Sequence, residues 1–510
     1  MIYFNTAIPK LIEMALFRRE GMLTATGAFL VYTGKYTGQS PNDKYIVETA
    51  DTVQDIWWEN NLKMSEKQFN SLHNKMLDYL RGKDLFIFAG YAGADPRYSL
   101  PVKVINEFAW QNIVMQQLLI RAQDTCWPVP TTPQLTVLAA PSFTANPAAD
   151  GTRSETFIII NPGRKLILIG GTHYAGEIKE SIFSLLNYLL PKQNILPMHC
   201  SANQAANGET ALFFGLSGTG KTALSTNTDR CLIGNDEHGW SQDGIFNIEG
   251  GCYVKCTRLS RKYEPEIWDA IKFGAILENV VVDNEARRPN YDSQAITENT
   301  RAAYPMDHIP NSIYPGTGSH PSTIVFMTAD AFGVLPPIAR LTTEQALFYF
   351  LSGYSSRPAG TETGITEPQA TFSACFGSSF FPLKPGVYAN LLKEKINRHK
   401  VRVFLVNTGW QGGPYSSGTR INSNNTRLLV TAALNGFLDS AEYITEPVFK
   451  LHRPLKCPGI PDDLLNPSLF WHSQTAYREN ALKLAAMFHS NACQADIPPE
   501  LFAAGPGYTN

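Results

Sequence analysis

The feature that most constrains this chain is a glycine-rich segment, Gly215-Leu216-Ser217-Gly218-Thr219-Gly220-Lys221-Thr222. Glycines at these spacings let the backbone curl so that successive N–H groups point at phosphate oxygens. Lys221 supplies a positive charge for the β and γ phosphates, and the Thr222 hydroxyl can hold a metal ion. An apolar run, residues 211–214, precedes the segment, and helix-compatible residues 222–225 follow it. The pattern predicts a strand, an ATP-phosphate-binding loop and a helix.

The length and charge of the chain bound its class. A chain of 510 residues is too long for one ordinary core, so we expect two large domains. A net charge of −2 gives no electrostatic reason to bind nucleic acid or an anionic membrane. We place the boundary near residue 200, between an N-terminal substrate-side domain and a C-terminal nucleotide-binding domain, 201–510. We expect a cytoplasmic protein, a monomer or small homo-oligomer, that acts on a small molecule.

The cysteines and the N-terminus carry no sign of secretion. Eight cysteines are present without a CxxC pair. Reduced, buried thiols are favoured over a disulfide framework or a zinc site. The N-terminal residues lack the basic-then-apolar order of a signal peptide, because charged residues such as Glu13 and Arg18 interrupt it.

A second glycine-rich turn lies between a predicted strand and a predicted helix. Residues 164–169 are typical of a buried strand, and the apolar residues of 178–189 recur at helical spacing until Pro191. The turn between them, residues 170–176, contains Tyr174. In α/β sheets such turns are where ligands bind.

Further residues indicate metal or anion binding. Asp236 follows an apolar run, residues 231–234, as a second metal-holding carboxylate would. His199 is either a structural histidine or, with Asp236 nearby, a metal ligand. Arg301 offers a planar guanidinium for a carboxylate or phosphate. A glycine-rich loop, residues 407–413, and Arg420 could line a nucleotide pocket. Residues 352–369 are either a mobile lid or an inert surface loop.

These blocks resemble the ATP-dependent phosphoenolpyruvate carboxykinases, from Thr33 to about Phe488. The most specific stretches are Gly170-Gly171-Thr172-His173-Tyr174-Ala175-Gly176-Glu177, Leu196-Pro197-Met198-His199-Cys200-Ser201 and the glycine-rich loop itself. The resemblance implies a two-domain α/β fold with a phosphate loop in the C-terminal domain. It also implies decarboxylation of oxaloacetate with phosphorylation by ATP, giving phosphoenolpyruvate, ADP and carbon dioxide, with Mg²⁺ and a second divalent ion, Mn²⁺.

The resemblance also implies roles for single residues. ATP would be held by Ser217, Gly218, Thr219, Gly220, Lys221 and Thr222, with Lys255, Arg301, Arg420 and Thr426 as further nucleotide contacts. The expected metal residues are His199, Asp236, Thr222 and Glu180. The expected catalytic residues are Lys221, Arg301, Tyr174 and Lys179.

Two departures fall at the acceptor end of the site. The family motif Thr-Gly-Arg-Ser-Pro-Lys-Asp-Lys reads Thr37-Gly38-Gln39-Ser40-Pro41-Asn42-Asp43-Lys44 here, so Gln39 replaces the arginine that grips the substrate. In the motif that contains Tyr174, Glu180 replaces the lysine that binds Mn²⁺. Three hypotheses follow: a carboxykinase, a divergent kinase for a less anionic acceptor, or a catalytically silent ATP-binding protein.

Overall fold

The first 170 residues form a mixed sheet of eight strands in the order β1-β6-β7-β8-β10-β9-β4-β5. The computed structural model describes residues 1–226, 229–357, 369–495 and 497–507. Strands β9 and β10 are buried along their whole length, as expected from their continuous apolar sequence. The bounds are β1 Ile2–Phe4, β4 Lys44–Glu48, β5 Leu62–Ser65, β6 Leu85–Ala92, β7 Leu100–Asn106, β8 Leu135–Ala140, β9 Phe157–Asn161 and β10 Leu166–Gly170.

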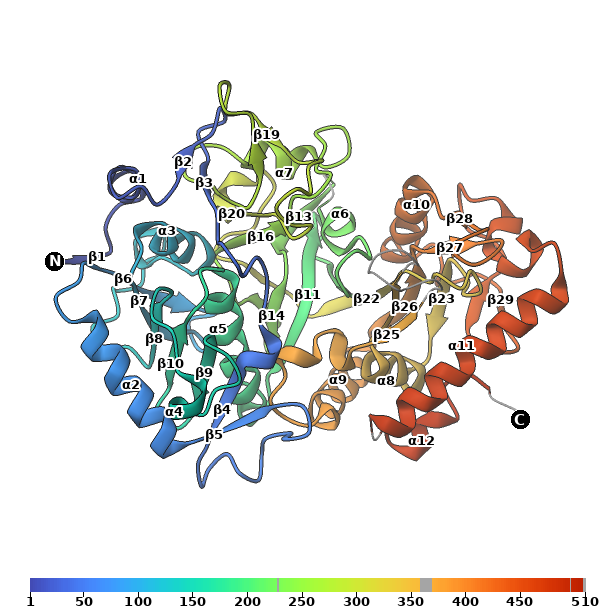
Figure 1. Ribbon diagram of the computed structural model, residues 1–510. Coiled ribbons are helices and arrows are strands. Elements are labelled where there is room, and N and C mark those ends of the chain that lie inside the picture. Colours follow the sequence, from blue (N-terminus) through green and yellow to red (C-terminus); the bar gives the residue numbers. More distant parts are fainter. Residues whose placement is uncertain (227–228, 358–368, 496, 508–510) are drawn as a thin grey trace.

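Five helices belong to the same part of the chain (Figure 1). They are α1 Ile8–Phe17, α2 Glu66–Leu80, α3 Ala109–Leu118, α4 Pro147–Asp150 and α5 Gly176–Leu189. Helix α2 begins at a capping box, in which Ser65 and Gln68 satisfy each other's backbone N–H groups. The predicted strand, turn and helix over residues 164–189 are confirmed as β10 and α5.

A second sheet has eleven strands in the order β21-β15-β14-β11-β12-β22-β26-β23-β30-β29, with β13 beside β11. Strands β12, β22 and β26 are parallel, so their carboxyl ends meet at one edge, where ligands bind in such sheets. The bounds are β11 Leu196–Ala205, β12 Thr210–Gly215, β13 Arg230–Gly234, β14 Glu237–Trp240, β15 Ile245–Asn247, β21 Thr317–Gly318, β22 Pro321–Thr328, β23 Ile338–Leu341, β26 Arg402–Asn407, β29 Tyr443–Thr445 and β30 His452–Pro454.

A third sheet combines strands from both sides of the predicted domain boundary near residue 200. Its order is β16-β20-β17-β3-β2, from β2 Met22–Leu23, β3 Phe29–Val31, β16 Gly251–Lys255, β17 Ile276–Glu278 and β20 Arg301–Pro305. The division near residue 200 stays a prediction. The mixed α/β class is confirmed by the three sheets and the helices around them.

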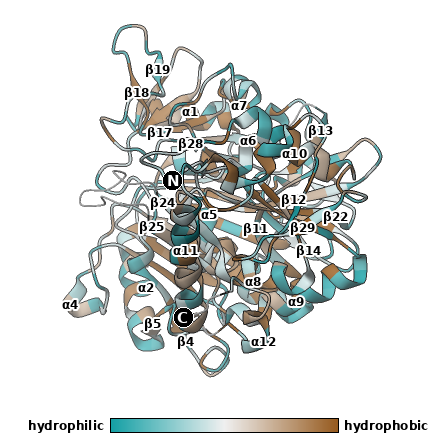
Figure 2. Ribbon diagram, turned by 90° about the vertical axis from the view of Figure 1, so that its right-hand side faces the viewer, coloured by the Kyte–Doolittle hydropathy of each residue, from teal (hydrophilic) through white to brown (hydrophobic). Residues whose placement is uncertain are grey.

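The remaining helices follow β12 in the chain, and Ile267 and Ala270 of α7 join the apolar cluster of the third sheet. They are α6 Lys221–Ser225, α7 Pro265–Ala270, α8 Thr343–Ser352, α9 Pro385–His399, α10 Ser423–Leu434, α11 Gln474–Gln494 and α12 Pro499–Phe502. Figure 2 shows hydrophilic faces on α9 and α10 and hydrophobic colour on strands such as β12. Helix α10 shares one apolar cluster with strands β12, β22 and β26, in which Phe213, Val325 and Leu429 are fully buried.

Part of the predicted lid is regular structure. Strand β24, Tyr354–Arg357, pairs with β25, Gln369–Phe372, as an antiparallel hairpin. The ends of the predicted lid are thus paired strands, and its role as a lid stays a prediction. Residues 358–368 lie outside the described residues. Within the part of the chain that is described, no helix is long and apolar enough to cross a membrane.

All eight cysteines are free, which confirms the expectation of reduced thiols. Their predicted burial is correct for five of them. Cys126, Cys231 and Cys493 are exposed instead, because they lie on a connecting segment, on a strand flank and near the end of α11.

A stacked histidine pair packs against the strand that follows Asp236. The ring centroids of His320 and His399 lie 3.7 Å apart with planes inclined by 19°. Trp240 Nε1 donates to His320 Nδ1 at 3.1 Å, and Lys395 Nζ donates to the Ser241 carbonyl at 3.1 Å. Burial, together with the charges of Lys395 and Arg398, lowers the pKa of His320 despite Asp243. Burial and the neighbouring His320, Arg398 and Lys395 also lower the pKa of His399.

This pair predicts acid sensitivity of the fold. The unfolded histidines, with a pKa near 6.5, bind protons before the folded ones, so the pair's contribution is present above that value and is lost as pH falls below it. We expect His399→Gln and His320→Gln to flatten the decline in the free energy of unfolding between about pH 7 and 5. Denaturant unfolding across that range measures it. Asn397→Gln, an exposed change in the same helix, should keep the wild-type slope, and equal slopes in all variants would contradict the prediction.

Candidate active site

The glycine-rich segment forms a tight turn between β12 and α6. Gly218 and Gly220 have φ values of +86° and +90°, in the left-handed region that favours glycine. A Cβ on Gly215 would lie 2.4 Å from Thr219 Oγ1, so the strand end also requires glycine. The Thr219 hydroxyl donates to the Leu216 carbonyl at 2.8 Å. The predicted strand, turn and helix are therefore present, and Lys221 is the first residue of α6.

Asp236 is the centre of the charged groups beside this turn. Lys221 Nζ lies 2.5 Å from Asp236 Oδ1, and His199 Nε2 lies 3.1 Å from the same oxygen. Burial would raise the pKa of Asp236, but the charges of Lys179, Lys221 and His199 outweigh it and hold that pKa well below its usual range. Asp236 is therefore a carboxylate at neutral pH.

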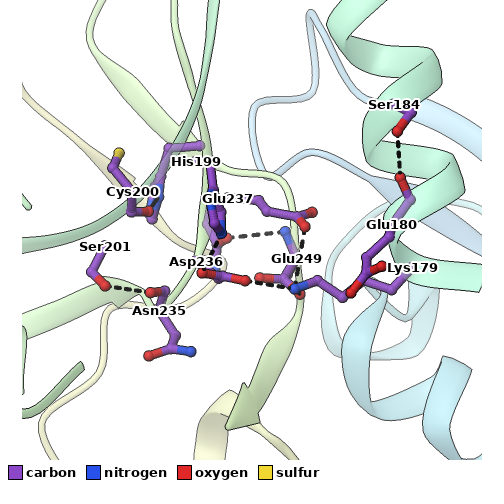
Figure 3. A network of polar contacts seen from close by, with 12 residues as sticks. Lys179, Glu180, Ser184, His199, Cys200, Ser201, Asn235, Asp236, Glu237 and Glu249 are labelled. Atoms are coloured by element: carbon purple, nitrogen blue, oxygen red, sulfur yellow. Dashed lines mark hydrogen bonds and ion pairs between the residues drawn. The ribbon is translucent and has the colours of Figure 1, made fainter. Parts of the chain in front are cut away.

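Lys179 reaches the same carboxylate from α5 (Figure 3). Its Nζ lies 2.9 Å from Asp236 Oδ2, 3.2 Å from Glu237 Oε1 and 3.1 Å from Glu249 Oε1. Its side chain is 4% exposed. Burial lowers the pKa of Lys179, but the three carboxylates outweigh it and keep the ammonium charged. Burial raises the pKa of Glu249 to about 7.

His199 has its two ring nitrogens engaged on opposite sides. Its Nδ1 lies 2.9 Å from the Phe376 carbonyl, which follows β25 in the chain. This contact favours a proton on Nδ1, because a carbonyl oxygen can only accept. Nε2 faces Asp236, whose Oδ1 it can reach as a donor at 3.1 Å, and Lys221 at 3.3 Å. Such a hydrogen bond to the second ring nitrogen is the usual way to orient a metal-binding imidazole.

Glu180 and Gln39 line a cavity together with Lys179, His199 and Asp236. Glu180 is 7% exposed. Burial raises the pKa of Glu180, while the charges of Lys179, Arg301 and Lys44 and the amide of Gln39 oppose that rise. The backbone N–H of Ser40 donates to Glu177 Oε1 at 2.6 Å, which fastens the loop that carries Gln39 to α5.

The predicted catalytic residues Tyr174 and Arg301 meet around Tyr253. The rings of Tyr174 and Tyr253 are 6.0 Å apart, and the Arg301 guanidinium carbon lies 5.4 Å from the Tyr253 ring centroid. Arg301 lines the cavity, whereas Tyr174 is 1% exposed behind it. Burial raises the pKa of Tyr174 to about 12. Tyr253 is fixed by donating to Glu278 Oε2 at 2.6 Å.

Most of these groups line one cavity of about 630 Å³, although Tyr174 and Glu249 do not. The cavity is also lined by Lys255, Arg420, Ser217, Gly218, Gly220, Lys221 and Thr222. Thr219 is buried beneath the turn, and Thr426 is buried in α10, where its hydroxyl donates to the Asn422 carbonyl at 3.3 Å. The structure thus brings together most of the predicted site residues, but not the side chain of Thr426.

Some lining residues are absent from the sequence-based prediction. Glu237 and Glu249 contact Lys179, and Phe376 and Phe380 lie against His199. The adjacency of Glu237 to Asp236 was the one available signal. Glu249 begins a block, Glu249-Gly250-Gly251-Cys252-Tyr253, that also matches the family, but the match assigns it no role. Phe376 comes from a distant segment that no local pattern marks.

The residues at the centre of the site supply some of the ligands that a divalent ion needs. His199 Nε2 and Asp236 Oδ1 lie side by side, and an imidazole nitrogen with a carboxylate oxygen is a usual pair of ligands. Across the described residues, no three His, Cys, Asp or Glu side chains are grouped closely enough to hold a metal. Glu180 lines the cavity without joining such a group, so its predicted metal role stays a prediction.

The fold is of the mixed α/β class, with a glycine turn between β12 and α6 that leads directly into Lys221. The phosphoenolpyruvate carboxykinase family model matches residues 1–463. The chain therefore belongs to the ATP-dependent phosphoenolpyruvate carboxykinase family.

Curated relatives support the same family. The chain is 56% identical to phosphoenolpyruvate carboxykinase (ATP) of Caldanaerobacter subterraneus over 506 residues, 99% of this chain and 97% of that protein. It is 58% identical to phosphoenolpyruvate carboxykinase (ATP) of Geobacillus kaustophilus over 492 residues, 96% of this chain and 93% of that protein. It is 56% identical to phosphoenolpyruvate carboxykinase (ATP) 1 of Moorella thermoacetica over 508 residues, 99% of this chain and 96% of that protein.

The geometry around Lys179 predicts a large structural effect. Lys179→Met leaves Asp236, Glu237 and Glu249 facing one another without their shared cation. Breaking a buried ionic network in this way costs about 3–5 kcal/mol. We expect that loss in the free energy of unfolding, measured by denaturant titration. Lys192→Met removes a half-exposed lysine paired with Asp55 and should cost at most about 1 kcal/mol. Equal losses in the two variants would show that the buried network is not special.

Proposed function

We propose that this protein converts oxaloacetate and ATP to phosphoenolpyruvate, ADP and carbon dioxide. The observation that carries the proposal is the convergence of Lys221, Lys179 and His199 on Asp236, directly beside the glycine turn. Three positive or proton-bearing groups in one cavity suit a reaction in which negative charge moves between a phosphate and an acceptor. The relatives named above support the same activity.

The nucleotide would occupy the end of the cavity formed by the turn. Backbone N–H groups of residues 217–222 would bind the phosphates, and Lys221 would lie beside the transferred group. Lys255 and Arg420 would take the adenine and ribose end, with Thr426 supporting the α10 side. On the sequence evidence given above, we also infer a domain boundary at residue 200 and a lid within residues 352–369.

Divalent ions fit the centre of the cavity. His199 and Asp236 would hold one, Mn²⁺, with Glu180 facing it, and Thr222 would contribute to Mg²⁺ bound with ATP. When bound, such ions neutralise charge on the phosphates and orient them. Lys179 orients Asp236, and the Phe376 carbonyl orients His199.

The acceptor would bind between the centre and Arg301. Arg301 lines the cavity and holds a guanidinium fixed by Asn299, to which its Nε donates at 3.0 Å. It would pair with a carboxylate of the acceptor or with the transferred phosphoryl group. Tyr174 packs behind it and limits water access. We further infer that the protein acts on small molecules in the cytoplasm, as a monomer or small homo-oligomer.

Lys221 tests the phosphoryl-transfer proposal. Lys221→Ala removes the charge beside the transferred phosphate while Lys179 still pairs with Asp236, so the fold should persist. We expect the rate of phosphoenolpyruvate formation to fall at least about 100-fold, as for other groups that stabilise developing charge. The assay follows phosphoenolpyruvate and ADP with Mg²⁺ and Mn²⁺ present. Lys10→Ala, at an exposed pair with Glu13, is the matched control. Wild-type protein that releases no ADP with oxaloacetate would overturn the proposed function.

The pair Gln39 and Glu180 tests the acceptor end. By the resemblance, an arginine stands at position 39 and a lysine that is neutral when it binds Mn²⁺ stands at position 180, so this cavity has one cation fewer and one anion more. We expect Gln39→Arg with Glu180→Lys to lower the KM for oxaloacetate by about tenfold or more, since one charge-assisted contact is worth about 1.5–3 kcal/mol. The KM for ATP should not change. Steady-state kinetics of wild type, both single variants and the double variant measure this, and an unchanged KM for oxaloacetate would contradict it.

A further inference from the structure

The loop that follows β26 packs directly against the glycine turn from behind. It runs from Asn407, the last residue of β26, to Trp410, and its Thr408 is 8% exposed. The Thr408 hydroxyl donates to the Thr219 carbonyl at 2.9 Å, across 189 positions of sequence. It also lies 3.2 Å from the Thr328 carbonyl, at the end of β22. One hydroxyl thus connects the carboxyl ends of two parallel strands with the phosphate-binding turn.

The backbone of this loop is held rigidly. The Thr408 N–H donates to the Thr328 carbonyl at 2.7 Å, and Asn407 Oδ1 accepts from the N–H groups of Asp330 and Gly409 at 3.1 and 2.8 Å. A Cβ on Gly409 would lie 2.2 Å from the Asp330 nitrogen, so this close approach requires glycine. The position of the Thr408 hydroxyl is therefore set by several fixed backbone groups.

The contact with the Thr219 carbonyl has a consequence for the next amide. In a planar trans peptide the C=O and the following N–H point to opposite sides. A Thr219 carbonyl fixed toward Thr408 directs the Gly220 N–H away from it. Among the residues that the structure describes, no backbone or side-chain acceptor receives this N–H. Gly220 lines the cavity, beside Lys221 and Thr222.

Arg420 supports the same face of the turn. Its Nε donates to the Thr408 carbonyl at 3.2 Å, and its Nη2 lies 3.5 Å from the Gly218 carbonyl. The guanidinium also stacks over Trp410, with its carbon 5.3 Å from the ring centroid. Thr408 and Arg420 thus engage two carbonyls of the turn, those of Thr219 and Gly218.

We propose that Thr408 is a positioning residue for phosphate binding, which turns the Gly220 N–H toward the nucleotide phosphates. The inference rests on the proposed function, since it needs a nucleotide in this cavity. It predicts that the hydroxyl of Thr408, and not merely its bulk, sets the affinity for the β-phosphate.

Calorimetric titration with Mg-ADP and with AMP tests the proposal on full-length variants. Thr408→Val keeps the shape and removes the donor, so the Kd for ADP should rise about tenfold. The Kd for AMP, which lacks the β-phosphate, should change less than about twofold. Thr408→Ser restores the donor and should restore the ADP affinity. Thr52→Val removes a buried hydroxyl that donates to the Val47 carbonyl far from the turn, and it should lower thermal stability without changing the Kd for ADP.

The outcomes separate this inference from the proposed function. Unchanged ADP binding in Thr408→Val, equal weakening in Thr52→Val, or no rescue by Thr408→Ser would each overturn it while leaving the proposed function in place. Wild-type protein that binds no ADP would overturn both. Should Thr408→Val not fold, Thr408→Cys keeps a similar volume with a weak donor, and an ADP affinity equal to wild type would then contradict the inference.

Discussion

The carboxylate of Asp236, held between Lys179 and Lys221, is the interaction on which the rest of the site depends. Lys221 contacts one oxygen and Lys179 the other, so two buried ammonium groups share one anion. Each lysine comes from a different helix, α5 or α6, and Asp236 immediately precedes β14. The ion network therefore fixes the distance between the helix before β11 and the helix after the glycine turn. Because burial strengthens each charge interaction, this arrangement keeps positive charge in place before any substrate binds.

The parts of the site that sequence reasoning predicted are local in the chain. The glycine turn requires left-handed φ at Gly218 and Gly220, and the glycines at these positions are visible in the sequence. The spacing of apolar residues predicts helix α5, which carries Lys179 and Glu180 as consecutive residues. By contrast, Glu249 and Phe376 reach Lys179 and His199 through pairings between distant segments. Sequence reasoning could not find them, since strand order and register are set by tertiary packing.

The same limit applies outside the site. The segment 352–369 is rich in Gly, Pro, Ser and Thr, and its composition does not predict that its ends pair as β24 and β25. Tyr354 supports this pairing through residues distant in the sequence, because its buried ring packs on Phe372 and Phe488 and its hydroxyl donates to Asp330 at 3.1 Å. Likewise, β2 and β3 join a sheet with strands more than 200 positions away. Amino-acid composition indicates where turns lie, but it does not identify strand partners more than 200 positions away in the sequence.

The two substitutions at the acceptor end act as a pair because Gln39 and Glu180 lie together in space. An anion at position 180 beside an arginine at position 39 would form an ion pair that removes the arginine from the substrate. With Gln39, Glu180 instead faces Lys179, Arg301 and Lys44, whose charges offset its burial. None of these changes reaches the glycine turn, where the contacts of Thr408 and Arg420 come from the opposite side of the cavity. The phosphate end and the acceptor end are thus supported by separate sets of residues, so the acceptor end can change its charge while the nucleotide end keeps its geometry.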